Sequence, residues 1–199
     1  MKDTFYEAVE KRRSIYALGN DKKVPEDQIQ KTVEFAVKHV PSPFNSQSAR
    51  VVVLFGKESN RFWDITREAL RKIVPANAFT ATDEKIGSFD SGYGTVLFFE
   101  DQTVVTGLMN QFPLYKDNFP VWSLQSNGML EFAVWTALEA EGLGASLQHY
   151  NPLVDTAVRD AWKLPDGWKL LAEMPFGSVK APAGPKEYSS IADRVKRFG

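Results

Sequence analysis

The segment from Val121 to Glu141 constrains the fold more than any other part of the chain. Its apolar side chains recur at helical spacing and cover most of the circumference. A helix on a domain surface needs only one apolar stripe, so this one is expected at the centre of the domain or between subunits. Gly142 and Gly144 then end it. The residues that set the pattern are Leu124, Gly128, Met129, Phe132, Ala133, Trp135, Thr136, Ala137 and Ala140.

Shorter helices and four apolar strands are predicted around this segment. Asp3 is expected to cap the first helix and Asn60 a later one, while Asn151-Pro152 would open a helix that runs through Trp162. Helices mixed with strands make the class α+β or α/β, and no linker divides the chain, so we expect one domain. Helices are predicted at 3–13, 25–40, 60–73, 101–112 and 151–162, strands at 51–55, 95–99, 145–147 and 168–175, and irregular chain at 17–23, 41–48, 75–94 and 177–199.

Composition removes several classes of function. The absence of cysteine excludes disulfides, thiolate nucleophiles and Cys-ligated zinc, and only two histidines, His39 and His149, are present, so no metal site is predicted. A formal charge of −1 gives no field that would draw the protein onto nucleic acid or a membrane. Neither a signal peptide nor a membrane span is seen, so a cytoplasmic location is expected. If the protein is a redox protein, its electrons must therefore sit on a cofactor.

Two guanidinium groups and a hydroxyl follow the first helix, at Arg12-Arg13-Ser14. Guanidinium is the side chain best matched to a phosphate, because it donates two parallel hydrogen bonds. The alternative is that cations at a helix C-terminus suit its dipole and stay solvated. Lys186 would add a third cation to a phosphate site if the C-terminal tail folds back, or would simply lie exposed.

The loop at residues 41–48 is stiffened by Pro41 and Pro43. Its short polar side chains can present hydrogen-bond partners to a flat heterocycle whose rim alternates donors and acceptors. The alternative is an ordinary turn in which these side chains satisfy their own backbone. The candidate residues are Ser42, Asn45 and Gln47.

The chain resembles the nitroreductase family of FMN enzymes over nearly its whole length, because four motifs occur in the same order. The stretch from Ser91 to Asp101 is similar to that of short bacterial and fungal nitroreductase-like proteins. The four motifs are Arg12-Arg13-Ser14, the Pro-Ser-Pro-Phe-Asn-Ser-Gln loop, the Gly142-Leu143-Gly144-Ala145 turn after the long apolar helix, and the basic tail.

This resemblance implies an α+β, nitroreductase-like fold with a central, mostly antiparallel β-sheet flanked by helices. It implies a single FMN-binding domain over residues 1–199, and a homodimer with two flavins at the interface. The extended C-terminal tail would embrace the partner subunit. The helix at 121–141, apolar nearly all round, independently calls for a partner surface.

The resemblance also assigns roles to residues. Arg12 and Ser14 match positions that hold the FMN phosphate, with Arg13 adjacent and Lys186 as the basic contact of the tail. Aromatic residues stand near this site where many members carry further basic residues, so the phosphate would rest on fewer cations. These residues are Tyr16 and Tyr188.

At the flavin ring, the backbone N–H groups of His149 and Tyr150 match donors that approach N5 and O4, where they would stabilise the reduced ring. Lys85 is the nearest counterpart of a further family contact. The residues that match contacts to the ring and ribityl chain, some of them from the partner subunit, are Ser42, Asn45 and Gln47. Candidate walls of an acceptor pocket, or plain packing residues, are Phe112, Tyr115, Phe119 and Trp122.

The activity implied by the resemblance is ping-pong transfer of a hydride from NADH or NADPH to flavin N5, and then of electrons to a small planar acceptor of the nitroaromatic or quinone type. No catalytic side chain is predicted, because the cofactor carries the reaction. One alternative is a flavin-binding regulatory or sequestering protein with little turnover, which the thinner cation set favours. Another is a helical interaction module without a cofactor.

Overall fold

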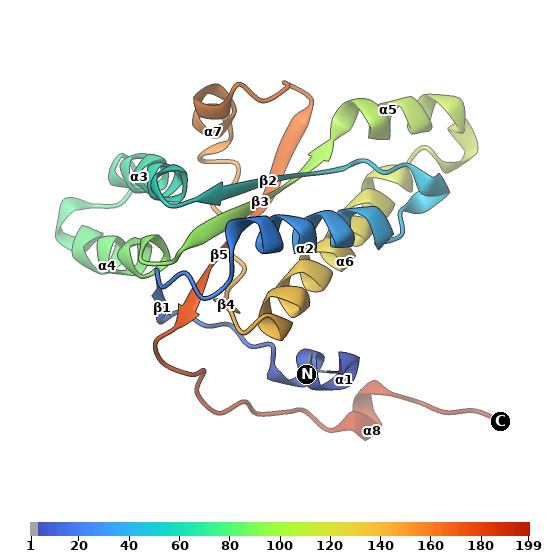
Figure 1. Cartoon of the computed structure of the whole chain (residues 1–199). Coiled ribbons are helices and arrows are strands. Elements are labelled where there is room, and N and C mark those ends of the chain that lie inside the picture. Colours follow the sequence, from blue (N-terminus) through green and yellow to red (C-terminus); the bar gives the residue numbers. More distant parts are fainter. Residues whose placement is uncertain (1–3) are drawn as a thin grey trace.

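The computed structural model describes residues 4–199, which form a five-stranded antiparallel sheet with helices on both faces (Figure 1). The strands run in the order β1-β5-β3-β2, and β4 also pairs with β5. The predicted α+β fold with a mostly antiparallel sheet is therefore confirmed. The strands are β1 Leu18–Gly19, β2 Ala49–Phe55, β3 Gly94–Asp101, β4 Gly144–Ala145 and β5 Trp168–Val179. The helices are α1 Phe5–Lys11, α2 Glu26–His39, α3 Lys57–Arg71, α4 Phe79–Asp90, α5 Gln102–Gln111, α6 Phe119–Ala140, α7 Asp155–Trp162 and α8 Ile191–Arg194.

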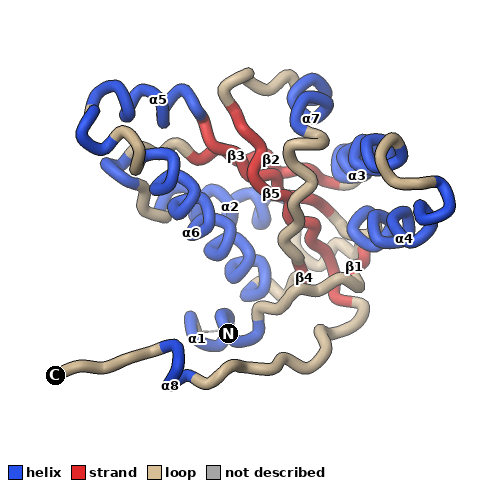
Figure 2. Tube along the Cα trace, turned by 180° about the vertical axis from the view of Figure 1, so that it is seen from behind, coloured by secondary structure: helices blue, strands red, loops and turns tan. Residues whose placement is uncertain are grey.

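The central strands β3 and β5 are buried on both faces, because their side chains alternate between two cores. Val96 and Phe98 belong to a core with α2 and α6, whereas Leu97 and Phe99 belong to a second core with α3, α4 and α7. Figure 2 shows these helix groups on opposite sides of the sheet. This double coverage explains the continuous apolar run that predicted β3.

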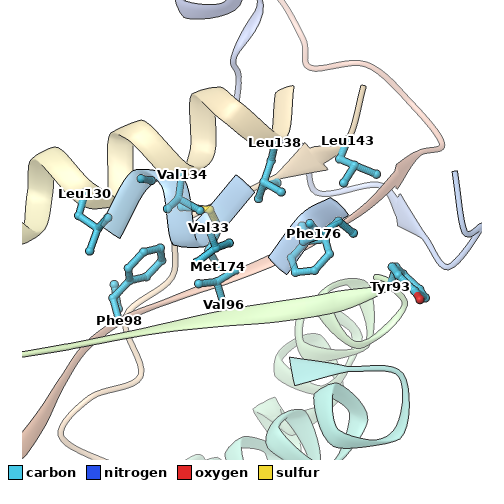
Figure 3. Close-up of a cluster of buried hydrophobic side chains, with 14 of the residues drawn as sticks. Val33, Tyr93, Val96, Phe98, Leu130, Val134, Leu138, Leu143, Met174 and Phe176 are labelled. Atoms are coloured by element: carbon cyan, nitrogen blue, oxygen red, sulfur yellow. The ribbon is translucent and has the colours of Figure 1, made fainter. Parts of the chain in front are cut away.

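Helix α6 covers the sheet with one side and leaves another side open. Leu130, Val134 and Leu138 recur every four residues and point into the core (Figure 3). Leu124 and Met129 on the same helix are 52% and 46% exposed. The predicted helix is thus present, with an apolar side that the described chain does not cover. Within residues 4–199, no helix has both the length and the hydropathy to cross a bilayer.

The chain after β5 leaves the body, runs past α1 and ends far from the sheet (Figure 2). Its apolar side chains are 63% to 90% exposed. A segment this apolar and this extended contributes little to its own subunit's core. The residues concerned are Tyr188, Ile191, Val195 and Phe198.

The structure corrects the predicted boundaries around α3 and α4. Asn60 does not cap a helix, because α3 begins at Lys57 and the Asn60 side-chain amide donates to Asp90 Oδ1 instead (2.7 Å). Residues 75–94, predicted to be irregular, contain α4. That helix forms in a polar sequence because Ile86 and Phe89 are buried against the second core, and Phe79 is buried at its first turn.

Three further boundaries differ from the prediction. The loop expected at 17–23 contains β1, and α7 begins at Asp155, so the cis pair Asn151-Pro152 precedes the helix and does not open it. The predicted cap Asp3 lies outside the described residues. Thr4 caps α1 instead, since its hydroxyl accepts the backbone N–H of Glu7 (3.4 Å).

Candidate functional site

The end of α1 and the C-terminal tail enclose a cavity of about 530 Å³. Arg12, Arg13 and Ser14 form one wall, and the tail from Ala181 to Lys186 forms the other. Arg13 joins the two walls, because its Nη2 donates to the carbonyl oxygen of Gly184 (2.9 Å). The four residues predicted to bind a phosphate are therefore gathered around one cavity.

Strand β4 holds the segment after α1 in position. The Ile15 N–H donates to the carbonyl oxygen of Ala145 (2.9 Å), and Ser14 forms a parallel bridge to the same residue. Gly144 permits this close approach, because a Cβ there would lie 2.9 Å from the side chains of both Ile15 and Val179. The glycine turn predicted from the sequence thus aligns the arginine segment with the sheet.

The cations of this cavity are not neutralised by the described part of the chain. No Asp or Glu lines the cavity, and neither Arg12 nor Lys186 has a carboxylate partner within residues 4–199. The Arg12 Nε is also buried without a hydrogen-bond partner there. Guanidinium, ammonium and hydroxyl donors that converge without a counter-charge fit a dianionic phosphate such as that of FMN.

The segment that follows β4 is fastened to β5 by its backbone. Gln148 and Glu173 exchange two hydrogen bonds, of 2.7 and 2.9 Å, and the Tyr150 N–H donates to Glu173 Oε2 (2.9 Å). His149 between them is exposed, and its N–H has no partner in the described chain. The two backbone donors predicted to meet a flavin therefore differ, because only that of His149 is available.

Glu173 is a completely buried carboxyl group beneath this segment. Its burial raises its pKa to about 8; the bond from Tyr150 opposes the shift, while Asp155 and Glu131 add to it. The pKa of Glu131, on α6, is likewise raised by burial, to about 7. Glu173 Oε1 has no hydrogen-bond partner in residues 4–199. Below its pKa the group is protonated, so the segment rests on a neutral carboxyl.

The loop at 41–48 has an unusual backbone. Phe44, Asn45 and Gln47 adopt φ of 55°, 52° and 49°, a left-handed conformation that costs a non-glycine residue free energy. Several hydrogen bonds hold the loop, and two of them involve the Gln47 backbone: the Ser42 hydroxyl accepts the Gln47 N–H (2.9 Å), and Arg50 Nη1 donates to the Gln47 carbonyl (2.7 Å). Asn45 and Gln47 themselves are exposed.

The loop and the phosphate-side cavity are separate within one chain. Ser42 and Gln47 line a second cavity of about 540 Å³, between α2 and the edge strand β2, and none of the loop residues lines the cavity of Arg12. Phe44 lies at the centre of an aromatic cluster that the sequence did not place around it. Its ring centroid is 4.8 to 6.4 Å from those of Phe112, Tyr115, Phe119 and Trp122.

One predicted residue lies away from both cavities, and two residues of the site were not predicted. Lys85 is exposed on α4, lies over Phe89 at 6.0 Å, and lines neither of the two cavities. Sequence reasoning missed Glu173, although a lone carboxylate within the apolar run 170–176 is a usable signal. It also missed Trp135, whose contact with Arg12 exists only through the packing of α1 on α6.

Comparison with known proteins gives one consistent result. The sequence model of the nitroreductase family matches residues 9–178. Nitroreductase FRM2 of Saccharomyces cerevisiae is 33% identical over 175 residues, which make up 87% of this chain and 86% of that protein. Nitroreductase CinD from Lactococcus lactis, solved in complex with chloramphenicol, is 44% identical, with a TM-score of 0.91 over 98% of this chain and 100% of that one. CinD has also been solved with 4-nitrophenol.

A more distant structure has the same fold. It is a nitroreductase with bound FMN from Desulfitobacterium hafniense DCB-2, matched over 100% of both chains with a TM-score of 0.72. At 17% identity, this likeness shows the fold alone.

Proposed function

This chain belongs to the nitroreductase family and is an oxidoreductase, and from that we propose that it is an FMN-dependent reductase. In this proposal the electron donor is NADH or NADPH, and the acceptor is a small planar nitroaromatic or quinone-like compound. FMN is held without a covalent bond at the cavity beside α1.

The observation that carries the cofactor assignment is that cavity. Arg12, Lys186 and Ser14 supply two cations and a hydroxyl without a lining carboxylate. Arg13 contributes its charge, but its Nη2 is occupied by the tail carbonyl of Gly184. We therefore assign direct phosphate contacts to the first three residues, and to Arg13 the task of holding the tail against them.

FMN, when bound, supplies the redox chemistry, taking a hydride from the nicotinamide donor and passing electrons to the acceptor in ping-pong order. The chain itself binds and orients the ring. The His149 N–H would donate to the ring edge at N5 and O4, where negative charge gathers on reduction. The Tyr150 N–H bond to Glu173 (2.9 Å) fixes the segment that presents this donor.

The remaining ring contacts would come from a second copy of the chain. Ser42, Asn45 and Gln47 do not reach the cavity of Arg12 in their own subunit, so we assign them to the flavin of the partner in a homodimer. The open apolar side of α6 and the exposed apolar tail support this assembly, since monomeric proteins rarely leave such surfaces bare.

The acceptor class rests on the relatives and on the aromatic cluster around Phe44. CinD binds two nitroaromatic compounds, chloramphenicol and 4-nitrophenol, in its solved structures. An apolar cavity of about 430 Å³ is lined in part by Phe44, Trp122 and Met129, and such a lining suits a small aromatic ligand. We propose that this wall contacts the acceptor.

An anaerobic titration tests the proposal. The protein is loaded with FMN, its two visible flavin bands are recorded, NADH or NADPH is added, and then a nitroaromatic or a quinone. We expect the bands to bleach with the nucleotide and to recover with the acceptor. Bound flavin that stays oxidised with both nucleotides would replace the reductase by a flavin-binding regulatory or sequestering protein, and no flavin binding would refute the proposal entirely.

A further inference from the structure

The side chain of Arg12 lies on an aromatic platform provided by α6. Arg12 is the C-cap of α1, and α1 packs against α6. Phe132 and Trp135 are three residues apart and so occupy the same side of that helix. The Arg12 Cζ lies 4.5 Å from the ring centroid of Trp135 and 5.8 Å from that of Phe132.

These rings are the contacts that fix the guanidinium. Its Nε is buried without a hydrogen-bond partner, and Arg12 forms no ion pair within residues 4–199. The indole Nε1 of Trp135 is also buried without a partner there, so the indole offers Arg12 its π-face only. The attraction between a guanidinium and an aromatic face is significant within about 6 Å.

An aromatic ring orients a phosphate-binding guanidinium better than a carboxylate would. A carboxylate would accept the guanidinium N–H bonds and would have to be displaced by the ligand. A ring orients the planar group through its face and leaves the edges free to donate in parallel. The platform also limits the freedom that Arg12 would lose on binding, which matters where Tyr16 and Tyr188 stand in place of further cations.

We propose that Trp135, assisted by Phe132, is a positioning residue for phosphate: its indole holds the Arg12 guanidinium with the N–H edges toward the phosphate group of FMN. This inference rests on the proposed function. It makes Trp135 a determinant of the preference for FMN over riboflavin, which has the same ring and ribityl chain but no phosphate.

The test compares the dissociation constants of FMN and riboflavin, measured by flavin fluorescence in full-length protein. We expect Trp135→Leu to weaken FMN by roughly 5- to 30-fold and to leave riboflavin within about 2-fold. Trp135→Phe, which keeps a ring, should restore most of the FMN affinity. Trp162→Leu is the matched control, because Trp162 lies on α7 with Arg61 over its ring (5.3 Å) and makes no contact with Arg12; it should leave the ratio of the two constants unchanged.

Other outcomes overturn the inference in distinguishable ways. If Trp135→Leu leaves the ratio of the FMN and riboflavin dissociation constants unchanged, the role of Trp135 is refuted. The proposed function still stands in that case, provided that the wild-type protein binds FMN. Wild-type protein that binds neither flavin refutes both. Should Trp135→Leu fail to fold, Trp135→Met keeps the apolar bulk without a ring and decides in its place. In an Arg12→Ala background, Trp135→Met should change FMN binding less than about 2-fold, and a full effect there contradicts the proposal.

Discussion

The two sides of the candidate site are built differently. The phosphate side consists of Arg12–Ser14, Gly144–Tyr150 and the tail at 181–186. Backbone bridges tie the first segment to β4 and the second to β5, and Arg13 holds the tail. The loop side, Pro41–Ser48, contains three left-handed non-glycine residues, all of them exposed, and is held by hydrogen bonds at its two ends and at the Gln47 backbone.

This difference teaches which contacts can be preorganised within one subunit. The groups that we assign to the phosphate, and the His149 N–H that we assign to the flavin ring, lie on a framework that is complete in a single chain. The loop side presents adaptable side chains at a surface, as suits contacts that are completed only when a second subunit arrives. Four experiments probe this contrast, from the largest expected effect to the smallest.

The first experiment tests whether the buried carboxyl of Glu173 stabilises the phosphate side, by measuring how the free energy of unfolding depends on pH. Its pKa of about 8 in the folded protein exceeds the ordinary 4.5, so the folded state holds the proton more tightly. This contribution to the free energy of unfolding is complete below pH 4.5 and is lost as the pH rises toward 8. The free energy of unfolding should fall by up to about 1.4 kcal/mol per pH unit, or about 4 kcal/mol from pH 5 to 8. Glu173→Gln, which still accepts the Tyr150 N–H, should flatten that decline in denaturant unfolding.

Glu131 adds a smaller decline of the same sign that the Glu173→Gln variant retains, because its own raised pKa is about 7. Glu84→Gln, at an exposed position on α4, serves as control and should follow the wild-type curve. If the free energy of unfolding falls with pH equally in wild-type protein and in Glu173→Gln, the segment after β4 does not depend on a neutral carboxyl at position 173.

The chemical difference between the sides is tested by flavin affinity. Arg12→Ala should weaken FMN by about 1.5 to 3 kcal/mol, because a charge-assisted bond to phosphate is lost, and should spare riboflavin. Asn45→Ala should weaken both flavins alike, since in our assignment the loop side contacts the ring, which the two flavins share. Equilibrium binding measures both, with Arg61→Ala on the surface of α3 as control. An unchanged FMN constant for Arg12→Ala contradicts its assignment.

Mixing subunits tests whether the two sides come from different chains. Arg12→Ala protein and a loop variant with Ser42, Asn45 and Gln47 replaced by Ala are unfolded together in equal amounts and refolded. Activity is measured at an FMN concentration that fills the wild-type site but leaves each variant alone nearly empty and inactive. Half of the dimers should be mixed, and each mixed dimer regains one intact site of two, so about a quarter of wild-type activity returns. No recovery would mean that both sides serve the same subunit's flavin.

Relief of the backbone strain in the loop should give the smallest change. Gln47→Gly should stabilise the fold by up to about 1 kcal/mol in denaturant unfolding, because glycine adopts the left-handed conformation without steric cost. Ser46→Gly is the matched control: with φ of −62°, Ser46 gains nothing and the change should destabilise by about 0.5 to 1 kcal/mol. Equal effects would indicate that the loop relaxes.

Much of this arrangement could be predicted from the sequence. Strand β3 and helix α6 follow from local apolar periodicity, which is a property of neighbouring residues. The gathering of Arg12 with Lys186 could be predicted from the family resemblance, because no local pattern joins residues so far apart in the chain. Helix α4 could not, since its polar sequence becomes helical only through burial of one face. The Arg12–Trp135 contact could not either, because it joins residues that only the packing of α1 on α6 brings together.

Helix α6 makes three contacts with the candidate site at different points along its length. Trp122 belongs to the aromatic cluster, Ser126 Oγ donates to the Pro41 carbonyl at the foot of the loop (2.8 Å), and Trp135 supports Arg12. The two tryptophans are 13 positions apart, about 20 Å along the helix. A one-residue insertion between them would turn one end by about 100° relative to the other and misalign both. The number of residues between Trp122 and Trp135 is therefore fixed by the two contacts that they make at opposite ends of the helix, a requirement that does not apply to the loops around it.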